Sequence, residues 1–216
     1  MKKRIAVIIA LIMTLSLAGC SLSLTEPEEI VNDFFQGLKT KNEDTLILYT
    51  ENEDINMLLH SKGDEEVLNR LYEGLFENLS YKILSVKKNK EETKATAEVE
   101  ISNADFSKVL KKYQDKAYSY MQSNLYSGNM TKKKLNAKCL ELFTQQVEKV
   151  SDKAAKARKE AREETSEASK TTKTKVKGMQ TQTITINLTK NDNYSWDMEL
   201  TEEMMEIILG GLIIPL

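Results

Sequence analysis

Hydrophobic and polar positions divide the chain into a helical first part, a hairpin, a second helical part and a second hairpin. Residues 27–38 repeat apolar side chains at intervals of three and four, and so do residues 45–59 and 65–79. This period predicts three amphipathic helices. Pro27 followed by two glutamates is typical of the first turn of a helix, so the first of the three should begin there.

The period then changes to two. Residues 81–86 and 94–102 predict the strands of a β-hairpin, because apolar side chains alternate with polar ones on either side of a lysine- and glutamate-rich turn. Residues 184–188 and 194–200 repeat this pattern around the sequence TKNDN. We therefore expect a second hairpin far downstream of the first.

The residues between the hairpins return to a helical period. An apolar stripe from Phe106 to Leu125 predicts one helix, and Thr131 is placed to cap a second. Beyond Val150 the stripe of the second helix shrinks to alanines among charged residues. We expect this helix to outrun its partner as an exposed arm that frays through residues 165–175.

These patterns together predict an α+β fold. The expected architecture is a curved antiparallel sheet of two hairpins, wrapped by N-terminal helices, with a long helical-hairpin insertion at about residues 103–178. Residues 27–216 are long enough to bury one core. We therefore predict a single domain.

The N-terminus has the layout of a secretory signal over residues 1–19, with Lys2, Lys3 and Arg4 before about a dozen apolar residues. The apolar run is too short for a stable membrane-spanning helix. Leu17-Ala18-Gly19-Cys20 resembles a bacterial lipobox. The resemblance implies cleavage between Gly19 and Cys20, a lipid on Cys20, and a tether over residues 20–26. The alternative is an ordinary signal with an incidental cysteine.

Charge is unevenly distributed along the chain. Removal of the signal leaves a net charge of about −5. This negative charge and the predicted extracytoplasmic location both argue against nucleic acid as a partner. Residues 26–79 carry about −10 and residues 149–177 about +5. The basic stretch is either a solvated helix face or an interaction arm for anionic lipid, wall polymer or an envelope protein. The residues of that candidate arm are Lys153, Lys156, Arg158, Lys159 and Arg162.

The sequence EPEEIVNDFFQGLKTKNEDTLILYT and the two hairpins resemble the nuclear-transport-factor-two-like, cystatin-type cone superfamily over residues 27–101 and 180–200. The resemblance implies a curved sheet wrapped by the first helix, with a possible pocket inside the cone. The candidate pocket residues are Phe34, Leu38, Tyr194 and Trp196. The alternative for these four residues is an ordinary core between sheet and helix.

Residues that could carry chemistry are few. His60 is the one histidine and is expected in a solvated turn, and Cys139 is expected as a buried, unpaired thiol, with an intermolecular disulfide as its alternative. A nucleophile needs a nearby base and a zinc site needs several His or Cys ligands. We therefore expect no catalytic site, no metal site and no cofactor beyond the covalent lipid.

The apolar C-terminus, residues 204–216, follows a helix start at Thr201. It is expected to pack on the domain, with a partner-facing or membrane-touching tail as the alternative. The sequence thus favours a non-catalytic binding or protein-interaction module, lipid-anchored on the extracytoplasmic face of the cell membrane. A small-molecule receptor using the cone pocket is the alternative, a cryptic enzyme is less favoured, and the oligomeric state stays open.

Overall fold

The computed structural model describes residues 25–124, 130–167 and 176–213, without the side chains of residues 164–167. The predicted signal, Gly19, Cys20 and residues 21–24 of the tether lie outside the described residues, as do Leu125 and residues 168–175 of the predicted frayed arm. The expectations for these segments therefore stay predictions.

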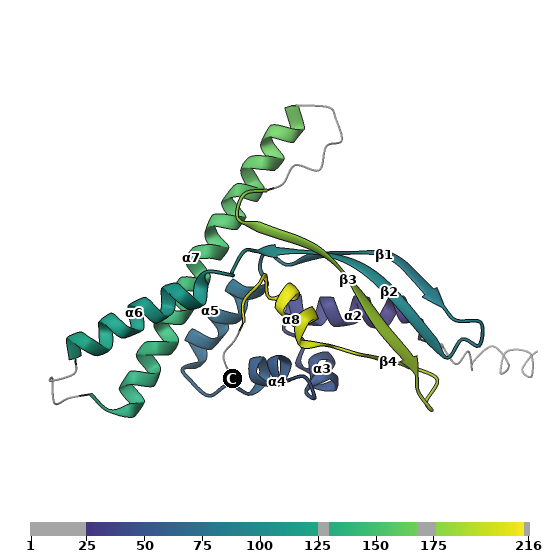
Figure 1. Cartoon of the computed structure of the whole chain (residues 1–216), viewed down its shortest axis with the longest axis horizontal. Coiled ribbons are helices and arrows are strands. Elements are labelled where there is room, and N and C mark those ends of the chain that lie inside the picture. Colours follow the sequence, from purple (N-terminus) through teal and green to yellow (C-terminus); the bar gives the residue numbers. More distant parts are fainter. Residues whose placement is uncertain (1–24, 125–129, 168–175, 214–216) are drawn as a thin grey trace, which may run out of the picture.

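The described helices lie on one side of the sheet and at one of its ends (Figure 1). They are α2 (Pro27–Thr40), α3 (Glu43–Leu46), the 3-10 helix η1 (Ile47–Tyr49), α4 (Glu53–His60), α5 (Glu65–Phe76), α6 (Val109–Asn124), α7 (Lys132–Glu167) and α8 (Glu202–Ile208).

The strands form one antiparallel sheet in the order β1-β2-β3-β4. Their bounds are β1 (Ser80–Lys88), β2 (Lys94–Ala104), β3 (Met179–Lys190) and β4 (Trp196–Met198). The two hairpins join through β2 and β3, which pair from Lys94↔Thr189 to Ala104↔Met179 although α6 and α7 separate them in the sequence. The predicted α+β fold, with its curved antiparallel sheet, is confirmed.

The core lies between α2 and the inner face of the sheet. Phe34, Phe35 and Leu38 on α2 are completely buried, and so are the alternate β2 residues Ala97 and Val99. A fully buried side chain of the size of Phe or Leu contributes about 1.5–3 kcal/mol of burial free energy, so this interface is a main source of stability.

The helix predicted over residues 45–59 is wrong as one element. The chain instead forms α3, η1 and α4, with a break at Thr50–Asn52. Asn42 and Asn52 act as N-caps and accept hydrogen bonds from the backbone N–H groups of Thr45 and Ile55, both at 3.2 Å. Because an asparagine side chain competes for backbone donors in this way, it restarts a helix rather than continuing one.

The second hairpin is asymmetric. The returning strand was predicted over residues 194–200, but β4 spans only Trp196–Met198. Tyr194 has a φ of 60°, which places it in the turn rather than in extended backbone. Asn191 closes this turn by accepting hydrogen bonds from the backbone N–H groups of Asn193 and Ser195.

Helix α7 is 36 residues long and does outrun α6, as predicted (Figure 1). Thr131 caps it, with its hydroxyl accepting from the Lys134 backbone N–H at 3.2 Å. The stretch beyond Val150 is not simply exposed, since Ser151 and Ala154 are buried. The prediction of an exposed arm therefore does not hold at Ser151 and Ala154.

The C-terminal segment packs on the domain as predicted, up to Leu212. Met205, Ile208, Leu209 and Leu212 are buried in the core. Gly210 reverses the chain behind α8, and its carbonyl accepts a hydrogen bond from the Phe106 N–H at 2.8 Å. Within the described part of the chain, no helix is both long enough and apolar enough to cross a membrane.

Candidate functional site

The four predicted pocket residues do not meet around a cavity. Phe34 and Leu38 have no exposed surface, and Trp196 is 5% exposed. Tyr194 is 64% exposed on the turn between β3 and β4. Because α2 fills the space beneath the sheet, none of the four lines any groove that we find among the described residues.

A groove of about 990 Å³ lies between the N-terminal helices and the C-terminal segment. Leu48, Tyr49 and the start of α4 form one wall, while the end of β4, helix α8 and Ile213 form the other. Seven carboxylates line it: Glu51, Glu53, Asp54, Glu199, Glu202, Glu203 and Glu206. We call this the acidic groove.

Two helix N-termini explain four of these carboxylates. Glu53 and Asp54 lie in the first turn of α4, and Glu202 and Glu203 in the first turn of α8. An acid at this position is stabilised by the helix dipole, so each pair is locally favourable. The fold then brings the two acidic ends to one groove, where their charges repel.

The pKa of Asp54 reports this crowding, whereas the pKa of Tyr49 responds to burial and to two carboxylates outside the groove. Burial, followed by the charges of Glu202 and Glu53, raises the pKa of Asp54. Burial and the charges of Asp33 and Asp197 raise the pKa of Tyr49 to about 12. In the described structure none of the seven carboxylates forms an ion pair with a basic side chain. The groove therefore holds negative charge without a basic partner.

The rim of the acidic groove is apolar. Leu48 is 75% exposed and Ile213 is 62% exposed, and Ile47 is exposed next to Leu48. Large apolar side chains exposed together are typical of interaction surfaces on soluble domains. The groove thus combines uncompensated negative charge with apolar contact area.

A second groove, of about 1330 Å³, lies between α4, α5 and the start of α7. Its walls are mainly apolar, with Leu58, Leu68, Leu140 and Phe143 among them. Its rim mixes basic and acidic residues, with Lys41, Lys62, Lys132 and Lys133 against Glu43, Asp64 and Glu65. Because these charges nearly balance, they do not indicate the charge of a ligand.

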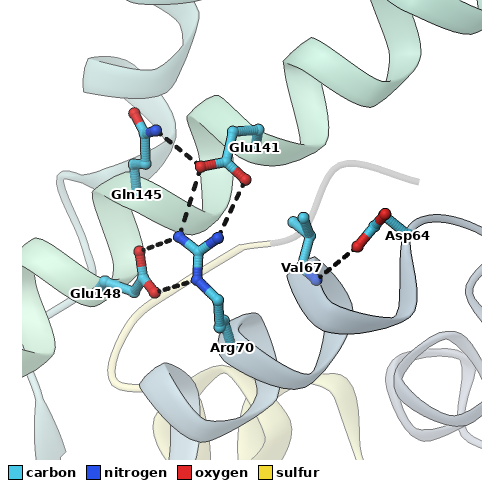
Figure 2. A network of polar contacts seen from close by, with 6 residues as sticks. All are labelled: Asp64, Val67, Arg70, Glu141, Gln145 and Glu148. Carbon is cyan, nitrogen blue, oxygen red and sulfur yellow. Dashed lines mark hydrogen bonds and ion pairs between the residues drawn. The ribbon is translucent and has the colours of Figure 1, made fainter.

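A polar network holds α7 against α5 (Figure 2). The Arg70 guanidinium donates two hydrogen bonds of 2.8 Å to Glu148 and longer ones to Glu141, which Gln145 also contacts. Arg70 is one-third exposed, so solvent screens this ion pair and limits its contribution to stability. The bidentate geometry mainly sets the register between the two helices.

Further along α7, the network continues with buried groups. Asn78 donates to the carbonyl and the hydroxyl of Ser151 at 3.0 and 2.8 Å. The Arg158 guanidinium donates to the Asn78 carbonyl at 3.0 Å. Burial, followed by the charge of Arg162, lowers the pKa of Arg158. Arg158 is therefore half-buried in a structural contact, which differs from the role predicted for it in an interaction arm.

The other predicted arm residues, Lys153, Lys156, Lys159 and Arg162, are exposed on α7. Lys156 is within 4.0 Å of Glu160. Lys153 differs from the rest because it lines a cleft against α6. The five predicted residues therefore have three different environments. Arg158 makes a structural contact, Lys153 lines a cleft, and the other three lie on the solvated face of α7.

The described residues include one histidine and one cysteine that could carry chemistry. His60 is exposed at the end of α4, and Cys139 is half-buried and unpaired on α7. Burial and a contact with Cys139 raise the pKa of the Tyr113 hydroxyl. Across residues 25–124, 130–163 and 176–213, no three His, Cys, Asp or Glu side chains are placed to hold a metal ion.

The acidic groove was not predicted from the sequence. Glu202 and Glu203 follow the predicted helix start at Thr201, and the acids near Asn52 belong to the negatively charged residues 26–79. The available signal was a pair of acids directly after each N-cap. No local pattern indicates that two such helix ends, about 150 residues apart, share one groove.

No protein-family model matches the chain, and no curated protein matches it. Among solved structures, ycdA from Bacillus subtilis, described as a candidate lipoprotein, is similar with 17% sequence identity and a TM-score of 0.37. The match covers 88% of this chain and 48% of that protein, so the chain spans about half the length of this neighbour.

Proposed function

We propose that the chain is a lipid-anchored, non-catalytic binding module on the extracytoplasmic face of the cell membrane. The support for the anchor is the sequence Leu17-Ala18-Gly19-Cys20 after an apolar signal. Two or more acyl chains hold a protein durably in a bilayer, whereas one chain binds marginally. The described chain begins at the sheet end that carries the β1–β2 hairpin, where Glu26 pairs with Lys88 (Figure 1).

We expect Cys20→Ser to abolish lipid attachment, because the lipid bond needs the thiol. Metabolic labelling with a radioactive fatty acid measures this directly, and fractionation measures the loss from membranes. Cys139→Ser is the matched control, since it removes the other cysteine of the chain. Equal labelling of the Cys20→Ser and parent proteins contradicts the anchor.

The binding function we propose is capture of a basic, amphipathic segment of an envelope protein in the acidic groove. The exposed apolar rim formed by Leu48 and Ile213 is the observation that carries this proposal. The seven carboxylates give the chemistry of the partner, because a basic segment would relieve their mutual repulsion. Leucines and lysines at helical spacing would fit both features.

The receptor alternative with a cone pocket is less favoured, since Phe34 and Leu38 are completely buried. A catalytic function is also less favoured. Its nucleophile would need a base within hydrogen-bond reach, and among the described residues we find no hydrogen bond between the exposed His60 and the half-buried Cys139.

The test uses the full chain in phosphatidylcholine nanodiscs, with empty nanodiscs as the blank. The probe is a synthetic amphipathic peptide of lysine and leucine, compared with a glutamate and leucine peptide of the same pattern. We expect only the basic peptide to bind. Glu202→Gln with Glu203→Gln should weaken its binding by about fivefold, as expected for two lost exposed charge pairs.

Glu65→Gln with Glu66→Gln is the matched control, because these acids occupy the first turn of α5, away from the acidic groove. This pair should change the affinity by less than the groove pair. Leu48→Ser, an apolar rim variant, should also weaken binding. Equal losses in the groove and control pairs would mean that net charge, and not the groove, attracts the peptide.

A further inference from the structure

A cleft of about 450 Å³ lies between α6, the middle of α7 and the loop before β3. Lys112 and Lys116 line it from α6, and Lys149 and Lys153 line it from α7. Each pair is spaced by four residues, so both of its ammonium groups lie on one face of their helix. We call this the lysine cleft; it is separate from the acidic groove.

The four lysines keep their charge available. None of them forms an ion pair with a carboxylate of the described chain. Asp105 and Asp115 also line the cleft. The Asp105 carboxylate is already engaged, since Oδ1 accepts hydrogen bonds from the Ser107 hydroxyl at 2.5 Å and from Gln180 at 2.8 Å.

These contacts also keep Asp105 ionised. Burial raises the pKa of Asp105, but hydrogen bonds from Ser107 and Gln180 and the charge of Lys108 outweigh it, and the net shift is downward. Asp105 and Asp115 therefore offset two of the four lysine charges. The cleft keeps a net positive charge of about two, which suits a small anion.

Gln146 gives the cleft a second, independent feature. Its side chain lines the cleft but is only 4% exposed. Within the described part of the chain, we find no hydrogen bond to its amide group. Its amide atoms keep access to the cleft, since among the described residues Thr144 Oγ1 is the buried side-chain atom left without a partner. The Gln146 amide could donate to an anionic oxygen.

We propose that the lysine cleft binds the phosphate group of an anionic ligand, with the four lysines supplying charge and Gln146 a hydrogen bond. Lysine ammonium groups bind phosphate as point charges, without the planar pairing that arginine requires. This site is additional to the acidic groove and does not depend on it. The phosphate could belong to a soluble or polymeric envelope compound or to a lipid headgroup.

The position of the cleft in the fold favours a soluble or polymeric compound as the source of the phosphate. Helices α6 and α7 lie at one end of the molecule, whereas the described chain begins at the other end, beside the β1–β2 hairpin (Figure 1). A tether over residues 21–26 extends to about 20 Å at most. The anchored end would therefore face the membrane, while the cleft would face away from it.

The experiment titrates the full chain in uncharged maltoside micelles with inorganic phosphate, by calorimetry. We expect millimolar or tighter binding. Lys149→Gln with Lys153→Gln should weaken it by about tenfold, because half of the lysine charge is lost. Lys156→Gln with Lys159→Gln is the matched control on the same helix, since these lysines are exposed outside the cleft. It should leave the affinity nearly unchanged.

Gln146→Leu tests the hydrogen bond without a change of charge. It should weaken phosphate binding while circular dichroism and the melting temperature show an intact fold. No heat at millimolar phosphate, or equal losses in the cleft and control pairs, overturns the proposal. Binding of an acidic peptide but not of phosphate overturns it as well, because the site would then recognise a protein.

A second arm identifies the source of the phosphate. The chain is anchored in phosphatidylcholine vesicles and mixed with phosphatidylglycerol vesicles, and clustering is followed by light scattering. Clustering that the cleft pair abolishes assigns the phosphate to a lipid headgroup of a facing membrane. Binding of free phosphate without clustering assigns it to a soluble or polymeric compound.

Discussion

At the scale of single residues, Gly210 is the described glycine that leaves least room for a side chain. Its φ is 61°, and a Cβ atom built on it would lie 1.9 Å from the Ala104 carbonyl oxygen. The Gly210 carbonyl accepts from the Phe106 N–H, so this contact joins the C-terminal segment to the end of β2. The close approach therefore holds one wall of the acidic groove in place.

We expect Gly210→Ala to lower the free energy of unfolding by about 2–4 kcal/mol, from backbone strain and the clash with Ala104 together. Gly178→Ala is the matched control, since Gly178 has a φ of 80° with nothing within 4 Å of the added atom. It should cost about 1–2 kcal/mol, from strain alone. Urea denaturation measures both values. If both substitutions lower the free energy of unfolding equally, the clash with the Ala104 carbonyl adds nothing to the cost of Gly210→Ala.

At the scale of elements, the predicted helices and strands match the structure where one face of the segment is buried. Helix α2 and the strands β2 and β3 have this property, and the sequence period alone locates them. Residues 45–59 were predicted as one helix because their apolar spacing continues across the break. The hydrogen bond from the Ile55 N–H to the Asn52 side chain instead starts a new helix after Asn52.

Side-chain environments were harder to predict than elements. The sequence pattern around Phe34 and Leu38 is the same whether these side chains line an open cone or fill it. The packing of α2 on the sheet determines which of the two occurs. Arg158 could not be distinguished from its exposed neighbours, because its partner is the Asn78 carbonyl, 80 residues away. Both grooves and the lysine cleft join segments that are distant in sequence, so tertiary packing alone assembles them.

At the scale of the whole molecule, charge is separated between two regions. The acidic groove gathers carboxylates from the N-terminal helices and the C-terminal segment, whereas the lysine cleft lies between α6 and α7 at one end of the fold. Burial and like charge in the acidic groove oppose folding at neutral pH, since the pKa of Asp54 is raised. Binding of a basic partner would remove part of this cost.

A raised pKa in the folded state means that protonation of Asp54 favours folding. This contribution is complete below the ordinary pKa of 3.8 and is lost as the pH rises through the folded-state pKa. We therefore expect Asp54→Asn to gain stability relative to the parent chain as the pH rises from 3.5 to 7, because asparagine never acquires the charge. Urea denaturation over this pH range measures the gain.

The Glu202→Gln background tests the cause. Burial is the largest cause of the raised pKa of Asp54, and the charge of Glu202 is the second. In the Glu202→Gln background, the pH-dependent gain in stability from Asp54→Asn should therefore be smaller but still present. The helix dipole opposes the destabilising effect of the Asp54 charge, because Asp54 lies in the first turn of α4, where the dipole favours a negative charge. If Asp54→Asn is less stable than the parent chain at pH 7, the dipole outweighs the repulsion, and the acidic groove then carries no electrostatic cost for a basic partner to relieve.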